Sequence, residues 1–195
     1  DRQLKQLLVE TPDAVVVNLG AGFDNRFSRV DNGKLLWFDV DLPDVIDVRK
    51  KVFPDCDRVT MVAADILTSE WTTAIPKDRK PILYAEGVFM YLTIDEIRTL
   101  LTVIKTAFPQ GGVLIAEQNN PMMVKQQKHH DTVKSTNAVF KSGTKSGNEI
   151  AALVSGFTMT EEHSFNEEMR KHSFSGKLFA LLLPNINDRW ATFTW

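Results

Sequence analysis

The sequence contains very little cysteine, and it lacks long apolar runs and a large net charge. Cys56 is the only cysteine among 195 residues, which excludes an internal disulfide framework and a cluster of thiolate metal ligands. No apolar run approaches the roughly 18 residues of a membrane-spanning helix, and no charged-then-apolar signal segment opens the chain. Lys plus Arg (23) nearly balance Asp plus Glu (25), so no overall charge attracts nucleic acid or anionic membranes. We expect a soluble, cytoplasmic protein with a small-molecule partner.

Several short catalytic patterns are absent as well. No Gly-Lys-Ser/Thr follows a glycine loop, which excludes a P-loop, and no serine lies in a Gly-x-Ser-x-Gly elbow. The histidines lack ligand spacing such as His-x-x-x-His, so we assign no metal. His129 and His130 lie in a charge-rich stretch that favours a solvated surface over a substrate contact. Cys56 lies between two aspartates, whose charges disfavour a nucleophilic thiolate.

Length and composition indicate one globular domain. At about 150 residues per domain, 195 residues predict a single domain over residues 1–195. With 43% hydrophobic residues, 12 Phe and 4 Trp, the chain can bury a core. The sequence carries no signal for a particular oligomeric state.

Apolar runs alternate with amphipathic stretches through the first two thirds of the chain. The predicted strands are Ala14–Leu19, Lys34–Val40, Val59–Ala64, Pro81–Ala85 and Val113–Ala116. The predicted helices are Pro43–Val52, Thr68–Ile75, Thr93–Phe108 and a short one around Leu4, Leu7 and Leu8. Thr93 and Glu96 form a capping box. Strands separated by helices favour parallel pairing, and continuous apolar strands indicate that both sheet faces are covered. The predicted fold class is therefore doubly wound α/β.

After Glu117 the sequence becomes polar. Residues 119–156 predict a helix after Asn120-Pro121 and then a loop-rich, variable cover on the substrate side. Phe157–Ser164 alternates apolar and polar residues, and Lys177–Leu183 is strongly apolar. These two segments predict a final antiparallel pair of strands.

Each of the five early strands ends in a polar or acidic residue. Ligands of open α/β sheets bind beyond the carboxyl ends of the strands, so these side chains mark a candidate binding edge. A single acid there is more often a solvated strand end or a helix cap, but five on one edge are a stronger signal. The side chains are Asn18, Asp39 with Asp41, Asp65, Glu86, and Glu117 with Gln118.

The Gly20-Ala-Gly22 turn after the first strand differs from the dinucleotide-binding pattern Gly-x-Gly-x-x-Gly. Its third glycine is replaced by Asn25, and Asp24 precedes the expected helix start, where it would repel a pyrophosphate. Gly22 and Asp41 are 19 residues apart, the separation at which an acid meets a ribose bound over the turn. A positively charged ligand with a ribose and no phosphates, such as S-adenosylmethionine, suits this edge. NAD satisfies the spacing too, so the spacing alone does not distinguish NAD from S-adenosylmethionine.

Four motifs, in order over roughly residues 14 to 118, resemble the leucine carboxyl methyltransferase family and its tetracenomycin-type polyketide O-methyltransferase branch. They read VVNLGAGFDNR at 16–26, WFDVDLPDVI at 37–46, ADI at 64–66 and YAEGVFMYL at 84–92. The resemblance implies a mostly parallel, seven-stranded class I methyltransferase sheet, Rossmann-like, with helices on both faces and the last two strands as an edge hairpin.

The resemblance also implies roles for particular residues. Gly20 and Gly22 would let the backbone approach the methionyl part of S-adenosylmethionine, and Asp41 would bind the ribose hydroxyls, with Asp39 the weaker candidate. Tyr91 is a candidate for the acceptor pocket. The implied cofactor-binding residues are Asn18, Gly20, Gly22, Asp39, Asp41, Asp65 and Ile66 against the adenine, Glu86 at the amino-acid end or sulfonium, and Gly87.

The sequence departs from the family in two places. Asn25 replaces the threonine usual after the motif's aspartate, a small polar exchange. Relatives also carry a substantial N-terminal helical cover. We expect either that this cover was removed or left out here, or that the protein has an open site.

We interpret the sequence as an S-adenosylmethionine-dependent O-methyltransferase that acts on a carboxylate of a small, polyketide-like molecule. A cofactor-binding but inactive or partner-dependent module is the alternative, and an NAD-dependent oxidoreductase is a third reading.

Overall fold

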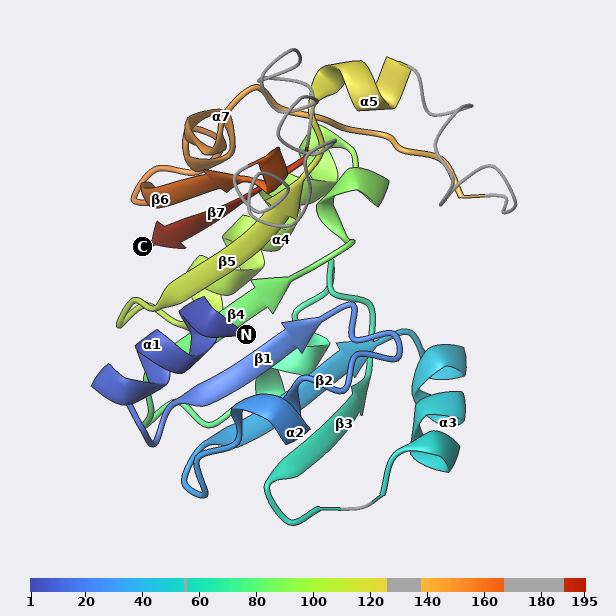
Figure 1. The fold of residues 1–195 in the computed structure, drawn as a ribbon, viewed down its shortest axis with the longest axis vertical. Coiled ribbons are helices and arrows are strands. Elements are labelled where there is room, and N and C mark those ends of the chain that lie inside the picture. Colours follow the sequence, from blue (N-terminus) through green and yellow to red (C-terminus); the bar gives the residue numbers. More distant parts are fainter. Residues whose placement is uncertain (55, 126–137, 167–187) are drawn as a thin grey trace. The chain divides into compact units, whose positions relative to one another are not determined.

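The computed structural model describes residues 1–54, 56–125, 138–166 and 188–195 (Figure 1). The strands of the described part are β1 (Val15–Leu19), β2 (Leu36–Asp41), β3 (Val59–Ala63), β4 (Pro81–Ala85), β5 (Val113–Gln118), β6 (Thr158–Ser164) and β7 (Arg189–Thr194). They form one seven-stranded sheet in the order β3-β2-β1-β4-β5-β7-β6. β1 pairs in parallel with β2 and β4, β2 pairs in parallel with β3, and β6 pairs antiparallel with β7. The predicted doubly wound α/β class is confirmed.

The chain divides into two compact units. The first comprises residues 1–85 and 102–114, and the second comprises residues 86–101 and 115–195. β1 to β4 belong to the first unit, β6 and β7 belong to the second, and β5 contributes residues to both.

The core of the first unit is built on β1 and β4, whose residues are all buried. Their aliphatic sequences VVVNL and PILYA suit strands covered on both faces. β3 differs from this expectation, because its residues are only partly buried or exposed. It is one of the two edge strands of the sheet, so fewer neighbouring elements cover it than cover β1. The prediction that every apolar run is a buried strand was therefore wrong for β3.

The helices largely follow the predicted ranges. They are α1 (Arg2–Glu10), α2 (Phe27–Val30), α3 (Pro43–Val52), α4 (Ile94–Ala107), α5 (Pro121–Lys125) and α7 (Gly147–Ala151), with 3-10 turns η1 (Glu70–Ala74) and η2 (Phe89–Tyr91). The capping box that starts α4 is present, since the Thr93 N–H donates to Glu96 Oε2 at 2.7 Å and the Glu96 N–H to Thr93 Oγ1 at 3.2 Å. The helix predicted over Thr68–Ile75 is the shorter η1.

The second unit corrects one sequence prediction. β6 covers most of the predicted segment Phe157–Ser164, but its antiparallel partner is Arg189–Thr194, which we had not predicted as a strand. The segment predicted instead, Lys177–Leu183, lies outside the described residues. β7 has the aromatic and β-branched residues that favour strands, and it is identified only by its pairing with β6. α7 was also missed within the expected cover.

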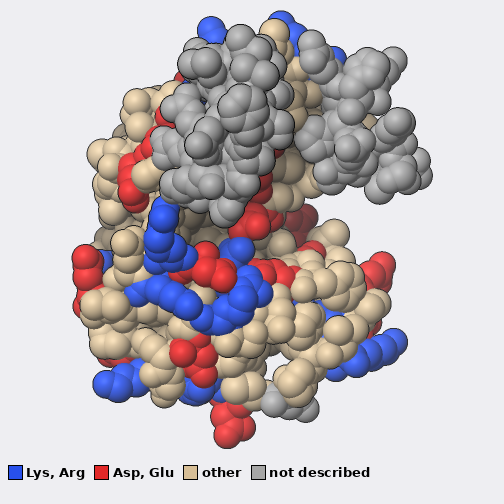
Figure 2. Space-filling model, in the orientation of Figure 1, with Lys and Arg blue, Asp and Glu red and all other residues tan. Residues whose placement is uncertain are grey.

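Charges of both signs are interleaved on one face of the described residues. On the face drawn in Figure 2, Lys and Arg side chains lie beside Asp and Glu, as their near balance in the sequence predicts. Within the described ranges, no helix is both long and apolar enough to span a membrane.

Candidate functional site

The chain turns sharply after β1, and this turn contacts the end of β2. The Gly20 N–H donates to the Val40 carbonyl oxygen at 2.8 Å, and the Gly22 N–H donates to Asp41 Oδ2 at 2.7 Å. Gly22 has a φ of +47°, and a Cβ built there would meet no atom within 4 Å. Glycine adopts this conformation without strain. The turn therefore presents an open backbone edge beside the Asp41 carboxylate, where a ligand has room to approach.

Beneath the turn lies a buried polar network centred on Asp39. Its Oδ1 accepts from Asn18 Nδ2 at 2.9 Å and from Trp37 Nε1 at 2.8 Å. Its Oδ2 accepts from Arg49 Nη2 at 2.8 Å and from Arg49 Nε at 3.1 Å. Asp39 is 1% exposed and Arg49 is 3% exposed, so this is a buried ion pair with satisfied hydrogen bonds. Asn18 and Asp39 thus act from beneath the turn, and direct ligand contact remains a prediction for Asp41.

Arg49 extends this network into the turn itself. Its Nη1 donates to the Gly22 carbonyl oxygen at 2.9 Å, and its Nη2 donates to the Asp24 carbonyl oxygen at 2.7 Å. The guanidinium presents its donors in a rigid fork, which fixes several acceptors at once. Arg49 follows Ile46 by three residues on the buried face of α3. Sequence reasoning missed Arg49, although an arginine in the buried stripe of a helix was the available signal.

Asp24 lies in a cluster of opposite charges. Its Oδ2 accepts from the Tyr84 hydroxyl at 2.8 Å, and Arg29 Nη2 lies 3.4 Å from its Oδ1. The Arg26 guanidinium lies over the Tyr84 ring at 4.7 Å, and both arginines also contact the Asp1 carboxylate. Arg26 Nη1 also lies 3.7 Å from Asp24 Oδ2, so both arginines pair with Asp24. The helix expected to begin near Asn25 is instead the four-residue α2, which begins at Phe27.

After β3 the chain forms a turn that Asp65 begins. The Leu67 N–H donates to Asp65 Oδ1 at 2.9 Å, and the Ile66 carbonyl oxygen accepts from Trp71 Nε1 at 3.1 Å. Trp71 is fully buried. The exposed Asp65 and half-buried Ile66 are therefore held on a turn anchored in the core of the first unit.

In the second unit, the chain that follows β4 turns at Gly87. This residue has a φ of +66°, open space where a Cβ would lie, and an N–H that donates to Glu117 Oε2 at 2.8 Å. Glu86 is exposed immediately before it. The predicted residues Glu86 and Gly87 thus lie on a turn tied to the end of β5.

Tyr91 lies on η2, half-buried against Phe140, with ring centroids 5.6 Å apart. Burial, together with the negative charge of Glu117, raises the pKa of Tyr91 above its ordinary value near 10. The phenol is therefore protonated at neutral pH, and it can donate a hydrogen bond but cannot act as a base.

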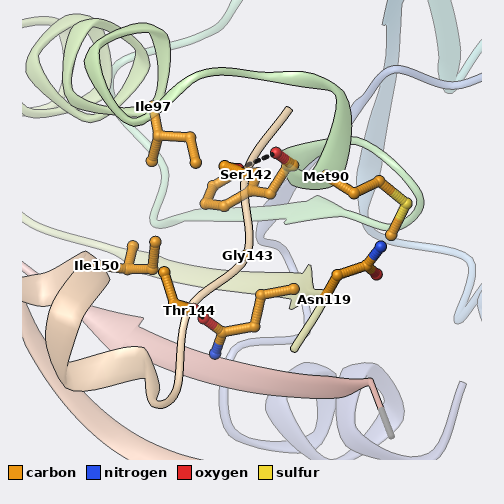
Figure 3. A pocket seen from close by; sticks show the side chains of 9 residues that line it. Met90, Ile97, Asn119, Ser142, Gly143, Thr144 and Ile150 are labelled. Atoms are coloured by element: carbon orange, nitrogen blue, oxygen red, sulfur yellow. Dashed lines mark hydrogen bonds between the residues drawn. The ribbon is translucent and has the colours of Figure 1, made fainter. Parts of the chain in front are cut away.

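A narrow pocket at the end of β5 holds a buried amide that sequence reasoning missed. Figure 3 shows Asn119 beside the end of the Met90 side chain, and Ser142 and Thr144 line the same pocket. Ser142 Oγ donates to the Phe89 carbonyl oxygen at 3.0 Å. Asn119 is 1% exposed, and its amide oxygen and nitrogen have no hydrogen-bond partner. The pocket leaves no room for a water molecule. An unpaired buried amide costs about 1–3 kcal/mol, which marks this position as unusual.

The histidines and the cysteine add no reactive cluster to the described residues. His129, His130 and His172 lie outside them. His163 stacks on Trp190 at 4.3 Å and contacts Glu161. Over residues 1–54, 56–125, 138–166 and 188–195, no group of three or more His, Cys, Asp or Glu is placed to hold a metal ion.

Comparison with known proteins identifies the family of this chain. Residues 2–105 match the family model described as leucine carboxyl methyltransferase. The chain belongs to this family. The resemblance that the four motifs predicted is confirmed, and the glycine turn, Asp41, Asp65 and Glu86 lie in the matched part.

Two relatives are similar to this member of the leucine carboxyl methyltransferase family over more than half of the chain. The tetracenomycin polyketide synthesis O-methyltransferase TcmP of Streptomyces glaucescens is 30% identical over 165 residues, which are 84% of this chain and 61% of TcmP. The S-adenosyl-L-methionine-dependent methyltransferase dpfgK of Gibberella zeae is 32% identical over 119 residues, 56% of this chain and 40% of dpfgK. The chain thus spans about three fifths of TcmP and less of dpfgK.

Among solved structures, a putative methyltransferase of Thermobifida fusca has a TM-score of 0.69 with 14% identity, covering 98% of this chain and 77% of the other. At this identity the likeness shows the fold alone. The family member therefore has the class I methyltransferase fold that the motifs implied.

Proposed function

We propose that this protein is an S-adenosylmethionine-dependent O-methyltransferase whose acceptor is a carboxylate of a small molecule. The observation that carries the proposal is the open glycine turn, held from below by the Asp39–Arg49 pair and bordered by Asp41. Family membership, TcmP as an O-methyltransferase and dpfgK as an S-adenosyl-L-methionine-dependent methyltransferase support methyl transfer from this cofactor.

The residues of the site suit a positively charged cofactor without phosphates. When bound, S-adenosylmethionine supplies a methyl group already activated by the sulfonium. The Asp41 carboxylate can accept hydrogen bonds from ribose hydroxyls, and the backbone at Gly22 leaves space for close approach. Exposed Asp65, on the turn that follows β3 in the same unit, adds negative charge, which disfavours a pyrophosphate.

A carboxylate acceptor is supported by the lack of a suitable base among the described residues of the site. An ionised carboxylate, with a pKa near 4, needs no proton removed at pH 7, whereas a phenol or alcohol usually does. Tyr91 is protonated, and no histidine among the described residues lies on the turns of the candidate site. The chain then contributes mainly positioning, which accounts for roughly 7–11 kcal/mol of barrier in well-aligned reactions.

Cofactor identity is tested by thermal unfolding. S-Adenosylhomocysteine at a hundredfold excess over its Kd is expected to stabilise the protein by about 2.7 kcal/mol, while NAD at equal concentration leaves the melting temperature unchanged. Stabilisation by NAD and not by S-adenosylhomocysteine would move the assignment to an oxidoreductase. Stabilisation by S-adenosylhomocysteine without turnover of any acceptor would favour an inactive or partner-dependent module.

The acceptor class is tested on the product. We expect a methyl ester, identified by mass spectrometry and hydrolysed by mild alkali, and a rate that changes little from about pH 6 to pH 8 because the acceptor is ionised throughout. An alkali-stable product, or a rate rising tenfold per pH unit through neutrality, contradicts the carboxylate acceptor and indicates a hydroxyl acceptor with a base.

A further inference from the structure

A cavity of about 590 Å³ lies in the second unit, where α5 meets the chain before α7 and the start of β7. Its volume is within the roughly 300–1,000 Å³ of small-molecule sites. Three of its lining residues are cationic, and among the described lining residues there is no acid. The described lining residues are Asn120, Pro121, Met122, Lys125, Lys145 and Arg189.

Arg189 is held in place with a donor left over. Its Nη1 donates to the Lys145 carbonyl oxygen and lies 3.8 Å from Glu162 Oε2. The arginine side chain is only 13% exposed, and its Nε is buried without a hydrogen-bond partner. A buried donor without a partner is uncommon in folded proteins, so this nitrogen is a candidate contact for an acceptor oxygen brought by a ligand.

The two lysines give the described lining of the cavity a net positive charge. Within the described ranges, neither the Lys125 nor the Lys145 ammonium has a salt-bridge partner, while Glu162 balances only Arg189. The hydrogen bond from Arg189 to the Lys145 backbone also keeps two of the three cationic residues together. An anion here would replace solvent with charge-assisted contacts.

Pro121 and Met122 supply apolar surface beside these charges, and Met122 is 45% exposed. A bare inorganic anion would leave that surface uncovered, whereas an organic anion would cover it. We propose that this cavity binds the acceptor as a small organic carboxylate, with its carboxylate on Lys125, Lys145 and Arg189 and its apolar body against Pro121 and Met122. That the bound carboxylate is the methyl acceptor rests on the proposed function, whereas its binding to the cavity is measured without the cofactor.

The test is calorimetric titration of the full chain with 2-naphthoate and with the uncharged, equally sized 2-naphthamide. We expect 2-naphthoate to bind at least about tenfold more tightly, because only it meets the three cations with a charge. K125Q and K145Q are each expected to weaken 2-naphthoate binding by about threefold to tenfold and to leave 2-naphthamide unchanged. Arg189 is left intact, because its Nη1 also bonds the Lys145 carbonyl oxygen.

The matched control is K5Q, which removes the same charge from the exposed face of α1 in the first unit and is expected to change nothing. Equal affinity for 2-naphthoate and 2-naphthamide, or unchanged 2-naphthoate affinity in K125Q and K145Q, overturns the proposal. Inorganic phosphate that displaces 2-naphthoate at equal concentration also overturns it, since the site would then be a simple anion site.

Failure of the proposed function is distinguished by a separate titration with S-adenosylhomocysteine. If 2-naphthoate binds in a lysine-dependent way and S-adenosylhomocysteine does not bind, the cavity is a carboxylate site and the methyltransferase assignment is contradicted. If S-adenosylhomocysteine binds and 2-naphthoate does not, only the carboxylate site is contradicted.

Discussion

Replacing Asp39 with alanine is expected to lower the free energy of unfolding by about 3–5 kcal/mol, the cost of leaving a buried charge without its partner. The Arg49 guanidinium would keep its place beneath the glycine turn but lose both bonds to Oδ2. The donors of Asn18 and Trp37 would lose their acceptor as well. Because small proteins are stable by only about 5–15 kcal/mol, this is a large fraction of the total.

Urea denaturation followed by circular dichroism measures this effect. Asp47→Ala is the matched control, since Asp47 is exposed on the same helix as Arg49 and its loss is expected to change stability by less than about 0.5 kcal/mol. Asp39→Asn keeps an acceptor for two of the four bonds and is expected to fall between the two. A loss below about 1 kcal/mol in Asp39→Ala would mean that the network does not hold the turn.

The second prediction concerns Asp41, whose substitution is expected to weaken S-adenosylhomocysteine binding about 10-fold to 100-fold while leaving the fold nearly intact. The reason is that Asp41 lies at the surface end of β2, beside the open edge of Gly22, where a charged acceptor can meet ribose hydroxyls. A charge-assisted hydrogen bond contributes roughly 1.5–3 kcal/mol, and about 1.4 kcal/mol is tenfold in affinity.

Asp41→Asn is the preferred variant, because its amide oxygen can still accept from one of the two backbone N–H groups that bind the carboxylate, those of Gly22 and Leu42. Calorimetric titration gives the Kd, and urea denaturation shows whether the fold has changed by less than about 1 kcal/mol. Asp44→Asn, an exposed acid in the first turn of α3, is the control and should bind as the wild type does. An unchanged Kd in Asp41→Asn would remove Asp41 from the binding edge.

These two variants test a ranking in which the sequence placed Asp41 ahead of Asp39 as the ribose ligand. Asp39 and Asp41 are two residues apart on one strand, and both were candidates for the ribose. Sequence could rank them only by resemblance, since strand periodicity places both on the same face. What separates them is Arg49, which α3 carries back under the strand to pair with Asp39 alone. Asp39 thereby becomes a stabilising residue, and its substitution is expected to damage the fold more than the ligand contact.

Most strands and helices up to β5 could be predicted well, because their signals are local. Pro43 at the start of α3, the capping box of α4 and the aliphatic runs of β1 and β4 each act within a few residues. The last strand could not be found this way. Arg189–Thr194 is less apolar than Lys177–Leu183, and only its ladder with β6 identifies it.

The sequence by itself determined the α/β class, the glycine turn after the first strand and the acids that end the strands, because periodicity and turn chemistry are properties of neighbouring residues. The tertiary structure alone decided which acid is buried, that Tyr84 holds Asp24 from 60 residues away, and that Lys125, Lys145 and Arg189 line one cavity. These contacts join residues far apart in the chain. Their partners are chosen by how the elements pack, which no local pattern records.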